Sequence, residues 1–260
     1  MRLKDKVIVV TGSNSGIGLG IAEEVLRQGA KLVLHGNDEA KLKAAQEQLA
    51  SDRVTAVAGD LTDPAVPQTL IDAALAAFGR LDGVVNNAGI SPRHNIETAT
   101  AEEFDFVFAV NLRAPMLVAK AAIAQFRKQK SAGAIVNIGS INAHCGQPDL
   151  LLYSMTKGGL QTMTRNLADA HGRELIRVNQ LNVGWTYTEN ENQIQLNEGR
   201  PEDWMDHLHP LSAPSGTILR PEQIAHHAIF WLSDDSAPVS GSVYEVEQYP
   251  LIGRNRISDN

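Results

Sequence analysis

The fold of this chain is decided by Val7-Ile8-Val9-Val10-Thr11-Gly12-Ser13-Asn14-Ser15-Gly16-Ile17-Gly18. Its four consecutive apolar residues suit a strand that is buried on both faces, as in a parallel sheet. Ile17, Ile21 and Val25 recur every four residues, which predicts a helix with Gly29 just beyond its end. Three glycines between the strand and the helix allow a tight turn, and the helix N-terminus offers free N–H groups to a phosphate. The stretch therefore predicts a pyrophosphate-binding turn.

The same alternation of short apolar runs and helical patterns continues along the chain. Asn37 or Asp38 can cap the second helix, Thr100 and Glu103 form a capping box, and Pro221 can open a late helix. Repeated strand–helix–strand units predict an α/β fold, a doubly wound parallel sheet with helices on both faces. The expected strands are Val7–Thr11, Lys31–His35, Val54–Ala58, Gly83–Asn86, Ala134–Gly139, Arg177–Leu181 and Ser242–Val246.

No linker or internal repeat divides the chain, so we expect a single domain over residues 1–260. The segment 185–219 is polar and without a clear period, and long loops in compact domains are usually functional or mobile. We expect a lid over the site there; a plain surface insertion is the alternative. A C-terminal tail at 248–260 either reaches a neighbouring subunit or frays.

Composition excludes several classes of protein. The chain has 23 Lys and Arg against 30 Asp and Glu, a net charge of −7, which argues against nucleic acid as a partner. Cys145 is the single cysteine, so no intrachain disulfide forms and a reducing, cytoplasmic location is expected. The run at 7–10 is too short for a signal peptide, and no apolar stretch approaches the ~20 residues of a membrane helix. We expect no metal site and no membrane partner.

Tyr153 and Lys157 are candidates for proton transfer because their spacing puts both side chains on one helix face. A free phenol has a pKa of about 10, and a nearby ammonium stabilises the phenolate and lowers that pKa. Such pairs occur by chance on many helices. Ser140, at the end of a strand, and Asn111, in a preceding helix, make the pattern more specific.

From Lys4 to Val246, these motifs resemble the short-chain dehydrogenase/reductase family. The likeness rests on three motifs. They are the Gly-x-x-x-Gly-x-Gly turn, Asn86-Asn87-Ala88-Gly89, and the set formed by Asn111, Ser140, Tyr153 and Lys157. The resemblance implies a Rossmann-type fold that binds NAD or NADP. It implies cofactor contacts at Gly12, Ser13, Ser15, Gly16, Ile17, Gly18, Gly36, Asn37, Asp60, Leu61, Asn87, Ala88, Gly89, Tyr153, Lys157 and Val183.

The resemblance also implies the catalytic roles. Tyr153 would be the general acid/base, and Ser140 would hydrogen-bond the substrate oxygen. Lys157 would hold the nicotinamide ribose and depress the pKa of Tyr153. Asn111 would position a water that links Lys157 to solvent. Hydride would pass between the substrate carbon and the nicotinamide.

The end of the second strand bears on the choice of cofactor. Gly36 stands where relatives that prefer NAD usually carry Asp, and Asn37 where relatives that prefer NADP often carry Arg. The nearest cation is Lys41, and a buried phosphate without a cation would be costly. Asp38 would repel that phosphate unless it only caps the helix. We expect a slight preference for NAD, with NADP left open.

The residues expected to line the substrate pocket are Ser140, Asn142, His144, Gln147, Trp185 and Glu189. So polar a lining suits a sugar, sugar acid or polyol. One alternative is a 3-oxoacyl-thioester reductase, whose carrier protein would dock on Arg127, Lys128 and Lys130. The other is a non-catalytic protein that senses the cofactor.

Two departures from the family pattern affect the ends of the last strands. Val183-Gly184 replaces the usual Pro-Gly, and Glu247-Gln248-Tyr249 replaces the usual Asp-Gly-Gly. Valine restores an N–H and frees φ, so the following loop can take a different path. The resemblance further implies a homo-oligomer, a tetramer or dimer, that acts on a small-molecule substrate.

Overall fold

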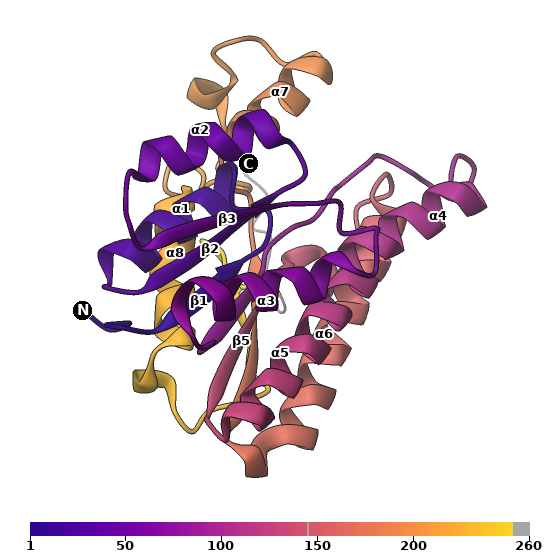
Figure 1. Ribbon diagram of the computed structural model, residues 1–260. Coiled ribbons are helices and arrows are strands. Elements are labelled where there is room, and N and C mark those ends of the chain that lie inside the picture. Colours follow the sequence, from indigo (N-terminus) through magenta and orange to yellow (C-terminus); the bar gives the residue numbers. More distant parts are fainter. Residues whose placement is uncertain (145, 252–260) are drawn as a thin grey trace.

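The computed structural model describes residues 1–144 and 146–251, and its strands form one parallel sheet in the order β3-β2-β1-β4-β5-β6-β7 (Figure 1). The strands are β1 Val7–Val10, β2 Lys31–Gly36, β3 Val54–Ala58, β4 Gly83–Asn86, β5 Gly133–Ser140, β6 Ile176–Val183 and β7 Val243–Val246. The predicted doubly wound sheet is confirmed. Each expected strand is found, with ends shifted by at most two residues.

Helices cover both faces of this sheet (Figure 1). Helices α1, α2 and α8 pack on one face, and α3, α5 and α6 pack on the other. The helices are α1 Gly16–Arg27, α2 Glu39–Leu49, α3 Val66–Phe78, α4 Ala101–Phe108, α5 Ala114–Gln129, α6 Leu151–His171, α7 Glu189–Asn197 and α8 Pro221–Leu232. Because the central strands are buried on both sides, their unbroken apolar runs identified them in the sequence.

The strand order reverses between β1 and β4, which run side by side although two other strands separate them in the chain. In doubly wound sheets a crevice opens at this switch point, beyond the carboxyl ends of the strands. The glycine turn after β1 and the Asn-Asn-Ala-Gly motif after β4 both lie there. The topology thus places the two motifs that the sequence singled out next to each other.

The helix that follows the expected Thr100 and Glu103 capping box is interrupted. It begins with α4, where Thr100 and Glu103 form the predicted capping box, and a π-helical turn at Ala109–Arg113 joins it to α5. Together these elements span Ala101–Gln129 and are long and apolar enough, by length and composition, to cross a membrane. The expectation that no apolar segment approaches that length is therefore wrong. Half of its most apolar window is buried within the protein, as in a core helix.

The segment 185–219 is more ordered than its composition suggested. It contains α7 and a short 3-10 turn, Trp204–His207, and lies beyond the carboxyl ends of the strands, at the top of Figure 1. Trp204 is fully buried and stacks on Trp185, with ring centroids 5.5 Å apart, and on Tyr187 at 6.5 Å. The segment has its own small apolar core, so it is not a simple loop. Its role as a lid stays a prediction.

Candidate functional site

The turn after β1 has room only for glycine. Gly12 and Gly16 have φ values of +60° and +55°, in the region that favours glycine. A Cβ on Gly18 would lie 2.1 Å from the carbonyl oxygen of Gly12, and one on Gly12 would lie 2.8 Å from Cα of Ala88. Ser15 is the N-cap of α1 but makes no capping hydrogen bond with its side chain. The turn therefore leaves a tight backbone cradle at a helix N-terminus, which fits a pyrophosphate.

The side chains of Ser13 and Asn87 make hydrogen bonds to backbone groups of the protein and do not face the crevice. Ser13 is fully buried, where its hydroxyl donates to the carbonyl of Val10 (2.7 Å) and accepts from the N–H of His35 (3.0 Å). The prediction that Ser13 contacts the cofactor is therefore wrong for its side chain. Asn87 Nδ2 donates to the carbonyl oxygens of Thr11 and Gly12, both at 2.9 Å, and so fixes the glycine turn.

The end of β2 carries no cation. A Cβ on Gly36 would lie 2.5 Å from Asn14 Nδ2, so the Asn14 amide occupies that space. Asn37 is exposed. Asp38 is the N-cap of α2, and its carboxylate accepts from the N–H of Lys41 (3.0 Å). Of the two roles expected for Asp38, the structure therefore shows the helix cap. The ammonium of Lys41 lies 3.9 Å from that carboxylate.

His35 links the three strand ends around the expected adenine site. Its Nδ1 accepts from the N–H of Gly12 (3.1 Å), so Nε2 carries the proton and donates to the carbonyl of Gly59 (3.1 Å). Burial lowers the pKa of His35, which keeps the ring neutral. Nearby, Asp60 accepts from the N–H of Thr62 (2.8 Å), whereas the side chain of Leu61 lies in the apolar core.

The structure brings Ser140, Tyr153 and Lys157 together at the carboxyl end of β5. Ser140 is 7% exposed and its hydroxyl accepts from the N–H of Asn142 (3.2 Å). Lys157 is 5% exposed; its Nζ donates to the carbonyl of Ile138 (2.8 Å) and lies 5.5 Å from the centroid of the Tyr153 ring. A Cβ on Gly89 would be 3.6 Å from that Nζ, so the loop after β4 approaches α6 closely here.

Burial dominates the acid–base properties of this group. It raises the pKa of Tyr153, and the carboxylate of Glu191 raises it further, whereas a hydrogen bond from Ser140 and the charge of Arg93 lower it. Burial also lowers the pKa of Lys157 to about 8. The expected lowering of the Tyr153 pKa by Lys157, whose Nζ is 5.5 Å from the ring centroid, stays a prediction. Ser140 and Arg93 are the groups that favour the phenolate.

Asn111 lies in the middle of the π-helical turn and is 1% exposed. Its Oδ1 accepts from the N–H of Ile90 (2.9 Å), and its Nδ2 donates to the carbonyl of Ile90 (2.8 Å) and to the hydroxyl of Thr156 (3.3 Å). The amide thus clamps the loop after β4 to α6. The predicted role in positioning a water stays a prediction, and the side chain's described contacts are already with protein groups.

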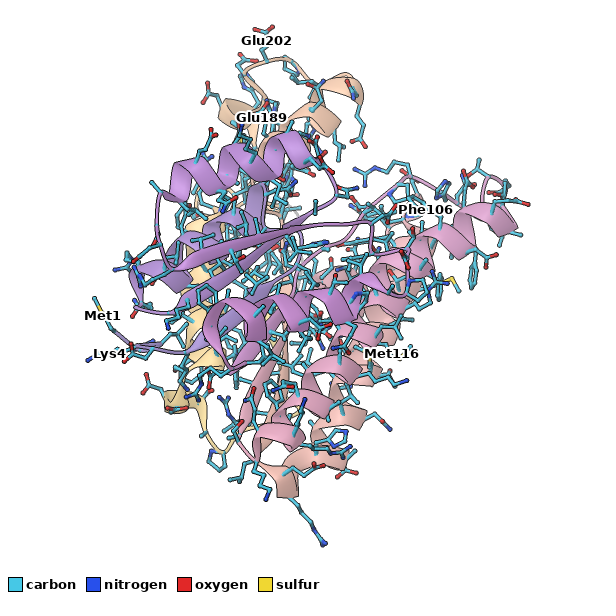
Figure 2. The ribbon with its side chains drawn as sticks, in the orientation of Figure 1. Met1, Lys4, Phe106, Met116, Glu189 and Glu202 are labelled. Atoms are coloured by element: carbon cyan, nitrogen blue, oxygen red, sulfur yellow. The ribbon has the colours of Figure 1, made fainter. Side chains whose placement is uncertain are left out.

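The structure gives the following surroundings to the residues expected to line the substrate pocket, whose role there stays a prediction. Trp185 packs in the apolar core of the 185–219 segment, and Glu189 is exposed at the start of α7 (Figure 2). His144 Nε2 lies 2.9 Å from a carboxylate oxygen of Glu245, at the β7 edge of the sheet. Gln147 is exposed. Among these expected residues, Asn142 is the one that directly contacts the catalytic group, through its backbone N–H.

Sequence reasoning missed three residues that the fold brings to this site. Arg93, in the loop after β4, forms an ion pair with Glu198 at the end of α7, with Nε and Oε1 2.7 Å apart. Thr188 caps α7 and accepts from the N–H of Glu191 (3.0 Å); its methyl group lies 3.3 Å from where a Cβ on Gly16 would stand. Threonine followed by acidic residues is a helix-start signal that could have located α7.

The two departures from the family pattern fit one another. Val183 is the last residue of β6, buried and paired with Val246, and not part of a rerouted loop. A Cβ on Gly184 would lie 2.0 Å from the Glu247 carboxylate, which accepts from the N–H groups of Trp185 (3.1 Å) and Gln248 (2.7 Å). Glu247, which stands where the family has Asp, therefore fastens the start of the 185–219 segment.

The end of the same segment is fastened by Gln248. Its side chain accepts from the hydroxyl of Ser215 (2.6 Å) and donates to the carbonyl of Thr217 (2.7 Å). Residues 252–260, and with them most of the predicted C-terminal tail, lie outside the described residues, as does Cys145.

A row of buried polar side chains runs behind Ser140 on the α6 side of the sheet. Each member donates to the next at 2.7–3.0 Å, in the order Asn86, Asn137, Thr164, Gln180 and Asn182. A Cβ on Gly139 would lie 2.3 Å from Asn182 Oδ1. The row therefore requires glycine immediately before the catalytic serine and fixes the backbone there.

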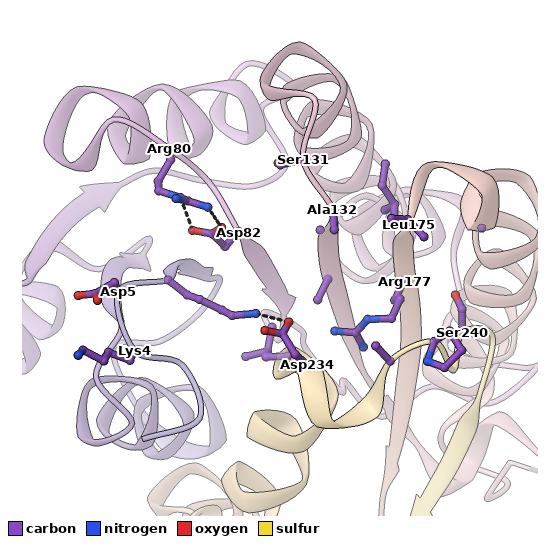
Figure 3. A pocket seen from close by; sticks show the side chains of 18 residues that line it. Lys4, Asp5, Arg80, Asp82, Ser131, Ala132, Leu175, Arg177, Asp234 and Ser240 are labelled. Carbon is purple, nitrogen blue, oxygen red and sulfur yellow. Dashed lines mark hydrogen bonds and ion pairs between the residues drawn. The ribbon is translucent and has the colours of Figure 1, made fainter.

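A second hollow lies at the opposite edge of the sheet, near the amino ends of the strands (Figure 3). It is a cavity of about 520 Å³. Its charged side chains are largely paired, Arg80 with Asp82 and Lys6 with Asp234, each at 2.5 Å. Arg177 donates to the carbonyls of Trp231 and Ser233, so it caps the end of α8. Within residues 1–144 and 146–251, no group of three or more His, Cys, Asp and Glu is placed to hold a metal ion.

Comparison with known proteins extends over nearly the whole chain. A family model described as Enoyl-(Acyl carrier protein) reductase matches residues 12–248. The chain is 34% identical over 249 residues to 2-(S)-hydroxypropyl-CoM dehydrogenase 3 of Xanthobacter autotrophicus, covering 95% of this chain and 96% of that protein. It is 33% identical over 247 residues to D-xylose 1-dehydrogenase of Caulobacter vibrioides, covering 94% and 95%. The crystal structure of levodione reductase superposes with a TM-score of 0.87 at 32% identity, covering 95% and 97%.

Proposed function

The chain belongs to the short-chain dehydrogenase/reductase family and is an NAD(P)-dependent oxidoreductase acting on CH–OH groups, and we propose that its substrate is a sugar, sugar acid or polyol. The observation that carries this proposal is the set of charged and hydrogen-bonding side chains on the segments that follow β4 and β6, where Arg93 pairs with Glu198 and Glu191 accepts from the indole N–H of Trp185, each at 2.7 Å. Such groups suit a substrate with several hydroxyls better than an acyl chain. The similarity to a D-xylose 1-dehydrogenase supports the same substrate class.

In the proposed oxidation, Tyr153 removes the proton of the substrate hydroxyl while Ser140 donates a hydrogen bond to the same oxygen. Lys157 has three N–H donors and gives one to Ile138, which leaves two for the hydroxyls of the cofactor's ribose. A bound nicotinamide would supply the hydride acceptor. The glycine turn and the start of α1 would hold its pyrophosphate. Reduction reverses each of these transfers.

Replacement of Tyr153 by Phe tests the assignment of the general acid/base. The variant keeps the ring and loses the proton, so kcat should fall at least ~100-fold with binding of cofactor retained. An unchanged kcat would refute the assignment of Tyr153 as the general acid/base. A wild type that binds the cofactor and turns over no substrate would favour a protein that senses the cofactor.

A panel of aldoses, sugar acids and polyols, read at the absorbance of reduced nicotinamide, tests the substrate class. Turnover of at least one of them is the expected result. Turnover of acetoacetyl thioesters with no response to any sugar would refute the proposal. The structure offers little support for that alternative, because Arg127 of the expected carrier-docking patch is paired with Glu174 at 2.5 Å.

NAD is the proposed preference among the two cofactors. The support is the absence of a cation among the described residues at the end of β2, where Asn14 fills the space beside Gly36 and the nearest ammonium, that of Lys41, lies beside Asp38. We expect kcat/KM to be at least ~10-fold higher with NAD, since a buried phosphate without a cation is costly. Equal values would refute the preference.

We also propose that the protein forms a homo-oligomer and that it is located in the reducing environment of the cytoplasm. Phe106 on α4 is 53% exposed and Tyr244 on β7 is 44% exposed, and a second copy would cover such side chains (Figure 2). The single cysteine in the sequence supports the location. Sedimentation analysis tests the oligomeric state, and a monomer at micromolar concentration would contradict the proposed oligomer. Cell fractionation tests the location.

A further inference from the structure

His35 stands between two segments that the cofactor is expected to contact. It lies near the carboxyl end of β2 and is buried, with 2% of its surface exposed. The strands β1 and β3 flank β2 on either side (Figure 1). The glycine turn follows β1, and the loop with Asp60 and Leu61 follows β3. The expected pyrophosphate and adenine contacts therefore meet at His35, directly before the expected ribose position at Gly36.

The imidazole ring of His35 bridges these two segments. Its Nδ1 accepts the backbone N–H of Gly12 at 3.1 Å, so Nδ1 carries no proton. Nε2 therefore holds the proton of the neutral ring, and it donates to the carbonyl of Gly59, also at 3.1 Å. Gly59 directly precedes Asp60 in the loop after β3. One tautomer of the neutral ring thus satisfies both partners.

The backbone of His35 fastens the same turn a second time. Its carbonyl accepts from the N–H of Ser13 (2.8 Å), and its N–H donates to the Ser13 hydroxyl (3.0 Å). On the other side of the turn, Asn87 Nδ2 donates to the carbonyl of Gly12. Gly12 has a φ of +60°, and glycine loses more conformational freedom than any other residue when it is held in one conformation. The contacts of His35 and Asn87 therefore give the turn one shape before a ligand arrives.

A second proton on the ring would reverse the contact with Gly12. Both nitrogens of a charged imidazole are donors, so the N–H at Nδ1 would point at the N–H of Gly12. Two donors cannot bond to each other, and the turn would have to move or lose that contact. The neutral ring and the observed turn therefore belong together.

Few charged groups surround the ring. The residues of β1 and the glycine turn (7–18) and those of β3 (54–58) include no ionisable side chain. At the start of α2, Asp38 and Lys41 lie beside each other, with 3.9 Å between carboxylate and ammonium. Burial lowers the pKa of His35, whereas the bond to Gly59 and the carboxylate of Asp60 raise it. Asp60 is thus the charged group that favours protonation of the ring.

We propose that His35 is a positioning residue for the cofactor: its neutral ring holds the glycine turn in the binding shape, so that protonation of His35 and binding of NAD or NADP oppose each other. A turn that is already ordered costs less conformational entropy when the ligand arrives, and this raises the affinity. The inference rests on the use of a nicotinamide dinucleotide and is independent of the proposed substrate class.

Two substitutions separate the roles of the ring nitrogens, and neither introduces a group that titrates. In His35→Asn the amide oxygen takes the place of Nδ1 and can accept from Gly12. In His35→Gln the amide NH2 takes the place of Nε2 and can donate to Gly59. At pH 8, His35→Asn should bind NAD within ~3-fold of the wild type, whereas His35→Gln leaves the N–H of Gly12 unpaired and should bind at least ~5-fold more weakly.

The dependence of affinity on pH is the readout that a merely structural role would not change. From pH 8 to pH 5, the Kd of NAD for the wild type should rise at least ~5-fold relative to that for His35→Asn. NADP serves as a second probe. Its 2′-phosphate titrates at about pH 6, but it does so with both proteins, so the ratio of their Kd values still reports the ring.

Two further measurements do not depend on cofactor affinity of the variants. Calorimetry of the wild type in two buffers of different ionisation enthalpy counts protons, and NAD binding at pH 5 should release up to about one proton and at pH 8 none. In the free protein, the lowered pKa of His35 means that the unfolded chain takes up the proton first as the pH falls. The lead in Tm of the wild type over His35→Asn should therefore shrink between pH 8 and pH 5. His226→Asn, at an exposed position of α8, is the matched control and should change neither pH dependence.

The opposite results would overturn the inference. A bound pyrophosphate could instead attract a charged ring, and then the wild type would bind NAD more tightly on acidification and take up a proton. Equal pH dependence of the wild type and His35→Asn, or equal affinity of the Asn and Gln variants at pH 8, would refute it too. A failed sugar panel refutes the substrate class alone, and equal kcat/KM with NAD and NADP refutes only the preference for NAD.

Discussion

The ammonium of Lys157 is buried beside the catalytic tyrosine, and its charge should cost the free protein stability. Its pKa is lowered from 10.5 to about 8, with burial as the cause. At about 1.4 kcal/mol for each pKa unit, keeping this side chain charged at neutral pH costs about 3 kcal/mol. Replacement by methionine, of similar length and uncharged, removes that cost. It also leaves the carbonyl of Ile138 without its donor, a loss of about 1 kcal/mol.

We therefore expect Lys157→Met to be about 2 kcal/mol more stable than the wild type at pH 7 and almost inactive. The sign of the pH dependence follows from the lowered pKa. Below about pH 8 the lysine is charged in both states and the folded protein bears the full cost. Between pH 8 and 10.5 only the unfolded chain holds the proton, so wild-type stability rises with pH. The advantage of the variant should be gone by about pH 9.5.

The measurement is urea unfolding of both proteins without cofactor at several pH values, at one fixed protein concentration because oligomers unfold with a concentration-dependent midpoint. Lys128→Met, at an exposed position of α5, is the control and should change the free energy of unfolding by less than ~0.5 kcal/mol. A Lys157→Met variant that is less stable than the wild type at pH 7 would refute the reasoning. A stability difference that does not vary with pH would refute it as well.

Three further experiments probe the glycine turn, the Arg93–Glu198 ion pair and the core of the 185–219 segment. Gly18→Ala puts a Cβ 2.1 Å from the nearest carbonyl oxygen, so we expect at least ~10-fold weaker cofactor binding by calorimetry; unchanged affinity would contradict the cradle. A double-mutant cycle of Arg93→Ala and Glu198→Ala should give a coupling below about 1 kcal/mol in urea unfolding, because both side chains are about 40% exposed; a larger value would show a desolvated pair. Trp204→Ala removes the centre of the 185–219 core and should raise the rate of proteolysis within that segment while leaving the exchange of sheet amides unchanged; equal protease resistance would contradict an independent core.

The sequence predicts those features that depend on neighbouring residues. A few neighbouring residues determine the local structure at three places, and the structure confirms all three. They are the apolar run at 7–10, the glycine turn and the Thr100 capping box. The π-helical turn that carries Asn111 is different. An i→i+5 hydrogen bond leaves no distinct period in the sequence, so the pattern predicts one continuous helix there.

The walls of the site depended on contacts between distant parts of the chain. Arg93 and Glu198 are 105 residues apart, and no local pattern pairs them. Helix α7 escaped detection because its inward face is polar, the reverse of the apolar stripe by which helices are usually found. Ser13 was misassigned because a serine in a glycine turn has the same appearance whether its hydroxyl faces a ligand or the next strand.

The row of hydrogen-bonded side chains behind Ser140 has a direction, because every bond from Asn86 to Asn182 is donated toward Asn182. Rotation of a single amide by half a turn would set two oxygens or two NH2 groups face to face. Substitution of one member alone therefore leaves a buried donor or acceptor of its neighbour without a partner, at a cost of about 1–3 kcal/mol, so the members are best changed together.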